Sequence, residues 1–293
     1  MNPYRFVIIP DPVRGAFGGG TTTVDVNTID YVDISTLGNA TDFGDLTVAR
    51  RAVDGVSSDV RGVFGGGQGG GTYVNVMDYI TIATTGNAID FGDLTVARRN
   101  VAGVNSDVRG AFGGGYNTTY SNVIDYITIA TTGNATDFGN LTFARTAPSG
   151  CNSDVRGVFS GGGYGADERM DYITIATTGN ATDFGNLNKA SAATSSVNSD
   201  VRGVIAISSA DNQIDYITIA TTGNATNFGD SLQVSHGQAA GVSSTTRGLF
   251  GGGYNTSNVS QNWIEYVTIA TTGNATDFGD LSQARAILAG VQA

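Results

Sequence analysis

The chain has few of the residues on which common active sites and disulfide-rich folds depend. Its 293 residues include one cysteine, Cys151, one histidine, His236, one tryptophan and four prolines. A single cysteine excludes an intrachain disulfide. Residues 1–9 lack the long apolar core of a secretory signal peptide, and no apolar run approaches the roughly 20 residues of a membrane-spanning helix. The sequence therefore predicts a soluble protein without a signal peptide and without membrane insertion.

Charged residues are also scarce, and most of them are acidic. They make up 14% of the chain, and 15 Lys and Arg against 26 Asp and Glu give a net charge of −11. This balance opposes non-specific attraction to phosphate backbones, so nucleic acid is not expected as a partner. With 40% hydrophobic residues and 43 glycines, the chain is too apolar for disorder. We expect a folded, turn-rich protein.

Repetition is what the chain has in abundance. Six copies of one unit begin at Arg14, Arg61, Arg109, Arg156, Arg202 and Arg247, so consecutive copies start 45 to 48 residues apart. The fullest copies read Arg-Gly-x-Phe-Gly-Gly-Gly, then a variable stretch, then Asp-Tyr-Ile-Thr-Ile-Ala-Thr-Thr-Gly-Asn-Ala. A period of this length is typical of a linear array or a closed ring.

Each copy contains signals for about four short strands, as the third copy illustrates. Residues 109–112 form a strand that stops at glycines, and residues 123–130 are β-branched and aromatic with apolar groups on both faces. A further strand is expected near residues 137–144, and a strand of small residues at 102–104. Because helical periodicity is absent, the copies predict an all-β fold: a six-bladed β-propeller with about four antiparallel strands per blade.

Two segments compete for the small-residue strand of the first blade. Residues 286–291 match it at the C-terminus, and residues 5–9 match it at the N-terminus. Three prolines, Pro3, Pro10 and Pro12, flank the second segment and favour an extended arm there. We therefore predict a propeller over residues 14–293 that 286–291 closes, and an arm or extra strand over residues 1–13. The arm either packs along its own ring or joins a neighbouring subunit through Tyr4, Phe6, Val7 and Ile8.

The order of residues within the copies resembles the kelch propeller repeat. Each copy has an arginine, a strand ending in small residues, an acid–tyrosine pair such as Asp125-Tyr126, and an aromatic residue such as Phe138 about 12 positions later. The sequence motif Thr-Thr-Gly-Asn-Ala-Thr-Asp-Phe-Gly is also similar to motifs in kelch-like repeat proteins of bacteriophages of marine and cyanobacterial hosts. This resemblance implies a virion setting, in a fibre, tail or capsid-decorating protein.

The copies differ mainly in one stretch, between the glycine cluster and the Asp-Tyr pair. In a four-strand meander this stretch shares a face with the loop after the outermost strand, where the copies carry Arg50, Arg98, Arg145, Ser191, His236 and Arg285. The near-constant Thr-Thr-Gly-Asn-Ala turns lie on the opposite face. One face is thus variable and the other uniform. In many proteins variable loops of this kind carry recognition, while the uniform part serves as the scaffold.

Aromatic and amide residues in the variable stretches are the candidate binding residues. They are Tyr73, Tyr116, Tyr120, Tyr164, Tyr254, Trp263, Asn255 and Asn262. Tyrosine and tryptophan beside amides suit stacking on sugar rings or anchoring a protein surface. The alternative is that several of these rings only cover blade edges.

Catalytic and metal sites find little support in the sequence. One histidine cannot supply the clusters of copper or zinc sites, and pairs such as Asp42 with Asp45 offer too few oxygens for calcium. We interpret these aspartates as Asx-turn residues around a Phe-Gly turn. Acid–base pairs two residues apart, such as Asp59 and Arg61, predict ion pairs between blades. No catalytic residue, metal or cofactor is expected.

The sequence-based hypothesis is a non-enzymatic structural and interaction module that presents a variable face. Its expected partners are other virion proteins or a second copy. A glycan- or receptor-binding propeller of the lectin type is the alternative, with a host-surface glycan or receptor as ligand.

Overall fold

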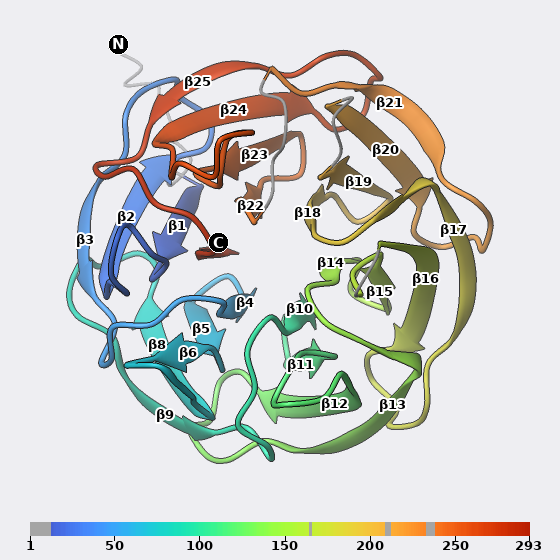
Figure 1. Ribbon diagram of the computed structural model, residues 1–293, viewed down its shortest axis with the longest axis horizontal. Coiled ribbons are helices and arrows are strands. Elements are labelled where there is room, and N and C mark those ends of the chain that lie inside the picture. The colour runs from blue at the N-terminus through green and yellow to red at the C-terminus, as the bar shows by residue number, and fades with distance from the viewer. Residues whose placement is uncertain (1–12, 164–165, 209–211, 233–237) are drawn as a thin grey trace, which may run out of the picture.

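Six four-stranded antiparallel sheets surround a central axis in the computed structural model of the chain (Figure 1). The structure describes residues 13–163, 166–208, 212–232 and 238–293, and these ranges contain strands and turns but no helix. The predicted six-bladed β-propeller is therefore confirmed. The arm residues Tyr4, Phe6, Val7 and Ile8 lie outside the described residues.

The strands of each blade follow one another from the axis outward. The innermost strands are β26 (Ala289–Gln292), β4 (Asp54–Ser57), β10 (Ala102–Asn105), β14 (Ser149–Asn152), β18 (Thr194–Asn198) and β22 (Ala240–Ser243). The second strands are β1 (Arg14–Gly18), β5 (Arg61–Gly65), β11 (Arg109–Gly113), β15 (Arg156–Ser160), β19 (Arg202–Ile207) and β23 (Arg247–Gly251).

The outer half of each blade carries the Asp-Tyr pair and the Phe-Gly pair. The third strands are β2 (Thr28–Asp33), β8 (Val76–Thr81), β12 (Ser121–Thr128), β16 (Asp167–Thr174), β20 (Gln213–Thr218) and β24 (Trp263–Thr268). The outermost strands are β3 (Thr41–Asp45), β9 (Ile89–Asp93), β13 (Thr136–Arg145), β17 (Thr182–Ser191), β21 (Thr226–Asp230) and β25 (Thr276–Asp280). The second blade adds a short hairpin, β6 (Gln68–Gly69) and β7 (Thr72–Tyr73).

The C-terminal strand closes the ring. β26 pairs antiparallel with β1, with Gly15 opposite Gln292 and Gly18 opposite Ala289. The first blade thus combines the last strand of the chain with the first three, as the sequence predicted. The strand begins at Ala289, three residues later than the predicted start at residue 286.

Small residues occupy the innermost strands because the blades converge at the axis. A Cβ atom added to Gly103 would lie 2.1 Å from the carbonyl oxygen of Gly55 in the preceding blade. A Cβ on Gly110, in the second strand, would lie 2.5 Å from Cγ2 of Val56. Only glycine permits these approaches, which explains the Arg-Gly pair and the small-residue strand.

The Phe-Gly pair of the second strand forms a repeated contact between blades. The ring of Phe112 lies where a Cβ on Gly65 of the preceding blade would stand, 2.8 Å from ring atom Cζ. Phe112 is fully buried, and burying such a side chain contributes roughly 1.5–3 kcal/mol. The fifth blade has Ile205 in place of phenylalanine, and the blade before it has Ser160 in place of glycine. The junction that has Ser160 in place of the glycine thus also has a side chain smaller than phenylalanine facing that position.

Candidate functional site

The uniform face of the ring is built from contacts between blades. The Oδ1 atom of Asn134 accepts a hydrogen bond from the backbone N–H of Asp93 in the preceding blade at 3.0 Å. The N–H of Gly133 donates to the carbonyl of Phe91, and that of Ala135 donates to Asp93. The same asparagine contact occurs at all six blade junctions. Ring assembly therefore explains why these turns hardly vary.

The Asp-Phe-Gly segments lie within strands rather than in turns. β3 contains both Asp42 and Asp45, so the Asx-turn interpretation of these residues is wrong. A β-bulge interrupts the register opposite Ile29 and Asp30. Gly44 has a φ of +146° there, and a Cβ on it would lie 2.4 Å from the carbonyl oxygen of Gly86. The bulge lets the outermost strand receive the turn of the next blade.

The arginines that begin the repeats do not pair with the acids two residues before them. Arg61 donates from Nη1 to the carbonyl of Ile129 in the next blade at 2.9 Å, and its guanidinium lies 4.2 Å from the ring centroid of Tyr79. Among the described residues none of the six repeat arginines forms an ion pair with a carboxylate of its own blade or of a neighbouring one, so the predicted ring of ion pairs between blades is wrong. The six repeat arginines do form a ring of contacts between blades, but they donate their hydrogen bonds to backbone carbonyls.

A different arginine forms buried ion pairs beneath the variable face. The four pairs are Arg50–Asp78, Arg98–Asp125, Arg145–Asp171 and Arg285–Asp30, with N–O distances of 2.5 to 2.9 Å. Arg98 also donates to the carbonyls of Phe112 and Gly114, and Thr95 donates to Asp125 from its N–H and its hydroxyl. Burial lowers the pKa of Arg50. The nearby carboxylate of Asp78 acts in the opposite direction and raises it. These arginines are thus interior links between blades rather than residues of the variable face.

In the two remaining blades, the equivalent buried acid accepts hydrogen bonds from other donors. Ser191, at the end of the fourth blade, replaces the arginine that would pair with Asp215 of the fifth. Instead, Gln213 donates from Nε2 to Oδ1 of Asp215 at 2.6 Å. Asn188 donates to Asp215 from both its N–H and its side chain. In the sixth blade the acid is Glu265, which accepts from Ser231, and His236 lies outside the described residues. The sequence interpretation missed Gln213, although it departs from the other copies together with Ser191.

Three of the predicted aromatic residues come together on the variable face. Tyr73 and Tyr116 have ring centroids 5.8 Å apart, and Tyr116 and Tyr120 have centroids 5.7 Å apart. The guanidinium of Arg99 lies 5.6 Å from the Tyr73 ring and 5.4 Å from the Tyr116 ring. We call these four residues the Tyr-Arg patch. It spans the junction of the second and third blades, and Tyr120 is 38% exposed.

Arg99 has no carboxylate partner within ion-pair distance among the described residues. Its Nη1 donates to the neutral amide oxygen of Gln68 at 2.6 Å, and its buried Nε has no hydrogen-bond partner. The equivalent residue one blade earlier, Arg51, forms an ion pair with Asp25 at 2.8 Å. The Tyr-Arg patch therefore combines aromatic faces with a cation that a ligand can neutralise.

The other candidate binding residues lie apart from this patch. The Oδ1 atom of Asn255 accepts hydrogen bonds from the N–H groups of Ser257 and Val259, so this side chain holds its own loop. Tyr254 is half-buried, Asn262 is exposed, and Trp263 is a half-buried residue of β24 rather than of a loop. Tyr164 lies outside the described residues.

No protein-family model matches the chain, and no curated protein matches its sequence.

Conventional reactive groups contribute little in the described part of the chain. Cys151 is buried, and burial raises the pKa of its thiol to about 12, so it is not a thiolate at neutral pH. The described residues contain no group of three His, Cys, Asp or Glu side chains placed to hold a metal ion. They also contain no helix that is long and apolar enough to cross a membrane.

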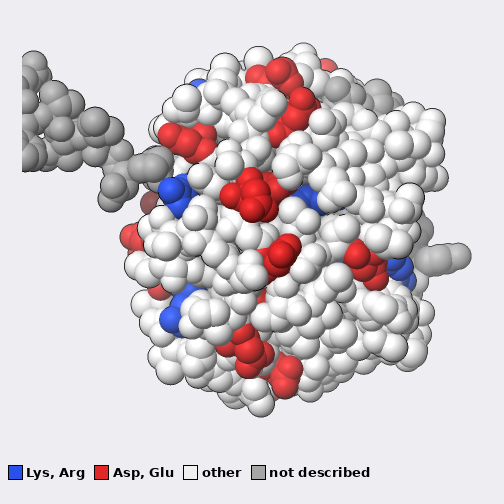
Figure 2. Space-filling view, turned by 90° about the vertical axis from the view of Figure 1, so that its left-hand side faces the viewer, with Lys and Arg blue, Asp and Glu red and all other residues white. Residues whose placement is uncertain are grey.

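The outer side of the ring carries more acidic than basic side chains in the view of Figure 2. The acids stand in separate groups, with uncharged surface between them. This side therefore offers no basic patch to a phosphate-rich partner.

Proposed function

We propose that the chain is a non-enzymatic structural and interaction module that contacts its partner through the variable face. The observation that carries the proposal is the difference between the two faces. On the uniform face the asparagine side chains of the turns are used to join blades. On the variable face, the Tyr-Arg patch presents aromatic rings and a guanidinium that no carboxylate of the described residues neutralises.

The biological setting we propose is a bacteriophage virion, as a fibre, tail or capsid-decorating protein. This part of the proposal is supported by the resemblance of the repeat sequence to phage kelch-like proteins. Its partners are other virion proteins or a second copy of the chain. A closed ring suits this role because β26 ties the two ends of the fold together, and each blade junction is hydrogen-bonded on the uniform face.

Glycan binding is the second candidate function, and the unneutralised Arg99 favours it. Tyrosine rings stack on the apolar faces of pyranose sugars, and a guanidinium binds a carboxylate through charge-assisted hydrogen bonds. The Tyr-Arg patch would therefore select saccharides that carry a carboxylate, such as uronic acids, over neutral ones. A virion protein with such a patch would recognise the surface of its host.

The test compares variants of the two faces for binding to virion particles that lack this chain. Tyr116→Ala and Arg99→Ala should each weaken binding at least tenfold without lowering the melting temperature by more than a few degrees. Val108→Ala is the control, because Val108 is 66% exposed in a turn of the uniform face. Equal losses from the patch and from Val108 would contradict the assignment of the faces.

A glycan array separates the second candidate from the first. Binding of the isolated ring to uronic acid oligosaccharides, lost in Arg99→Ala, would favour glycan recognition. Rebinding to particles without any glycan binding would favour a purely structural role.

A further inference from the structure

A cavity of about 100 Å³ lies on the axis of the ring. The innermost strands of all six blades and the loops that lead into them form its wall. This site is separate from the Tyr-Arg patch, none of whose residues lines the cavity. Its size admits a molecule of a few non-hydrogen atoms, since a cavity of about 10–15 Å³ on this measure already holds one water molecule.

Asp54 is the one charged side chain among the described residues that line this cavity. The equivalent positions in the other blades are Ala102, Ser149, Ser195, Ala240 and Ala289. The carboxylate accepts hydrogen bonds from the N–H groups of Gly55 and Gly103, each at 2.8 Å. Because each carboxylate oxygen can accept two hydrogen bonds, both oxygens retain acceptor capacity.

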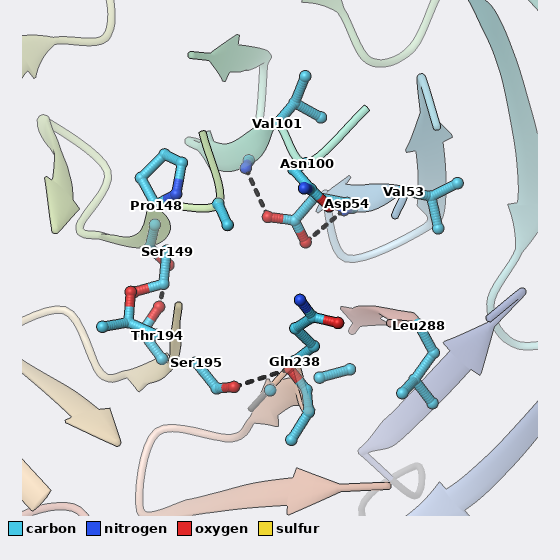
Figure 3. A pocket seen from close by; sticks show the side chains of 18 of the residues that line it. Val53, Asp54, Asn100, Val101, Pro148, Ser149, Thr194, Ser195, Gln238 and Leu288 are labelled. Atoms are coloured by element: carbon cyan, nitrogen blue, oxygen red, sulfur yellow. Dashed lines mark hydrogen bonds between the residues drawn. The ribbon is translucent and has the colours of Figure 1, made fainter. Parts of the chain in front are cut away.

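Two further acceptors in the cavity wall have no hydrogen-bond partner in the part of the chain that the structure describes. They are the Oγ atom of Ser149, whose side chain belongs to a residue only 5% exposed, and the Oε1 atom of Gln238. Figure 3 shows the side chains of Asp54 and Gln238 reaching into the same space between the innermost strands. A buried hydroxyl or amide without a hydrogen-bond partner destabilises the folded state. A ligand that donates hydrogen bonds would remove this destabilisation.

The described lining contains no lysine, arginine or histidine that could neutralise Asp54. The strands packed against β4 are β5, β10, β11 and β26, and neither Arg61 of β5 nor Arg109 of β11 lines the cavity. The cavity thus offers one negative charge and neutral acceptors. Divalent cations usually take more than the one carboxylate that the described lining provides.

We propose that the axial cavity binds a small organic ammonium ion whose charged end pairs with Asp54. The remaining polar groups of the ligand donate hydrogen bonds to Ser149 Oγ and Gln238 Oε1. Amino alcohols and short diamines have this chemistry, since they join an ammonium group to a second donor over a few atoms.

A purely structural role for Asp54 is the competing explanation, because its carboxylate bridges β4 and β10. The other blades weaken this explanation. Ala102 and Ala289 occupy the equivalent positions, and their innermost strands pack against the next blade without any carboxylate. The bridge is therefore dispensable for packing.

The protonation of Asp54 provides an independent readout. Burial raises its pKa to about 7, so a large fraction of the carboxyl groups is protonated at neutral pH. An ammonium ligand stabilises the ionised form and should lower this pKa. Ligand affinity should consequently rise with pH up to about pH 8 and then level off while the amine stays protonated.

The experiment is calorimetric titration of the full chain with ethanolamine at about pH 8, with ethylene glycol as the uncharged comparison. Ethanolamine should bind saturably, and ethylene glycol should not. Asp54→Asn should weaken ethanolamine binding more than tenfold, and Ser149→Ala should weaken it several-fold. Asp59→Asn is the matched control, since Asp59 is exposed in the turn after β4 and does not line the cavity.

A second measurement keeps the proposal testable if Asp54→Asn fails to fold. Carboxyl NMR of the wild-type chain should show the pKa of Asp54 falling by at least one unit when ethanolamine is added. No saturable binding together with an unchanged Asp54 titration would overturn the proposal. Equal weakening in Asp59→Asn would overturn it as well, because binding would then depend on net charge rather than on the cavity.

Discussion

The Arg98 guanidinium lies 2.7 Å from the Asp125 carboxylate, and both side chains are fully buried. Arg98 follows the outermost strand of the second blade, whereas Asp125 lies in the third strand of the third blade. The pair therefore links two consecutive blades, and three other junctions repeat it. Because both partners are desolvated, the contribution of each depends on the presence of the other.

Replacing Arg98 with methionine should lower the free energy of unfolding by about 3–5 kcal/mol, because Asp125 would remain buried without its counter-ion. Urea unfolding followed by tryptophan fluorescence or circular dichroism measures this change. Arg51→Met is the control, since Arg51 pairs with Asp25 at a partly exposed position. It should cost no more than about 1 kcal/mol. Similar costs for both variants would show that burial does not determine the strength of the Arg98 pair.

Substitution of two glycines in the sixth blade tests the docking of the uniform turns. Gly279 has a φ of +152°, and a Cβ on it would lie 2.4 Å from the carbonyl oxygen of Gly38, whereas a Cβ on Gly273 would meet no atom within 4 Å. Gly279→Ala should destabilise the ring by about 1–3 kcal/mol through backbone strain and displacement of the turn. Gly273→Ala should be nearly neutral. Thermal unfolding that ranks the two variants in the opposite order would contradict this account of the bulge.

Truncation at the two ends tests ring closure. Removal of residues 1–10 should leave the melting temperature nearly unchanged, because every blade keeps its four strands. Removal of residues 289–293 should lower it strongly, because the first blade loses β26 and exposes the edge of β1. Differential scanning calorimetry of the two truncated chains gives the comparison. A larger loss from the N-terminal truncation would mean that residues 1–10 contribute to the folded ring.

Asp54 should make stability depend on pH. Its pKa is about 7 in the folded chain against an ordinary value of 3.8, so the folded state binds more protons than the unfolded state between these values. The contribution of Asp54 to the free energy of unfolding should therefore decrease as pH rises from about 4 to about 7, by at most about 1.4 kcal/mol per pH unit. Above about pH 7 the decrease should end.

Asp54→Asn should remove this component, so the variant should gain stability relative to wild type as pH rises through that range. Urea unfolding at about pH 4, 5.5, 7 and 8 measures the difference between the two proteins. Parallel pH profiles would show that the pKa of Asp54 is not raised by folding.

The overall architecture could be predicted from the sequence because the repeat supplies six examples of the same local signals. Ring closure was predictable for the same reason, since the strand after Ile287 has the composition of the other innermost strands. Contacts between blades were harder to predict. Asp59 and Arg61 are neighbours in sequence, yet Arg61 contacts Ile129, 68 residues away. Only the placement of the next blade determines that partner.

The candidate site was predictable in composition but not in arrangement. The sequence identified Tyr73, Tyr116 and Tyr120 separately, and the hairpin of β6 and β7 brings Tyr73 of the second blade beside the loop of the third. Asn255 was as strong a candidate as these tyrosines from the sequence alone, but its side chain accepts a hydrogen bond within its own loop. Asp54 was not recognised, although it is the one carboxylate at its position among the six copies.

The most direct test of the proposed function is a cryo-electron microscopy reconstruction of the virion or other assembly that contains this chain, with both faces of the ring resolved. The account predicts a ring mounted on that assembly, with the Tyr-Arg patch of the variable face either seated against a partner or directed outward to a host ligand. A ring whose Tyr-Arg patch touches no partner and points into the interior of the assembly, away from any host ligand, would contradict it.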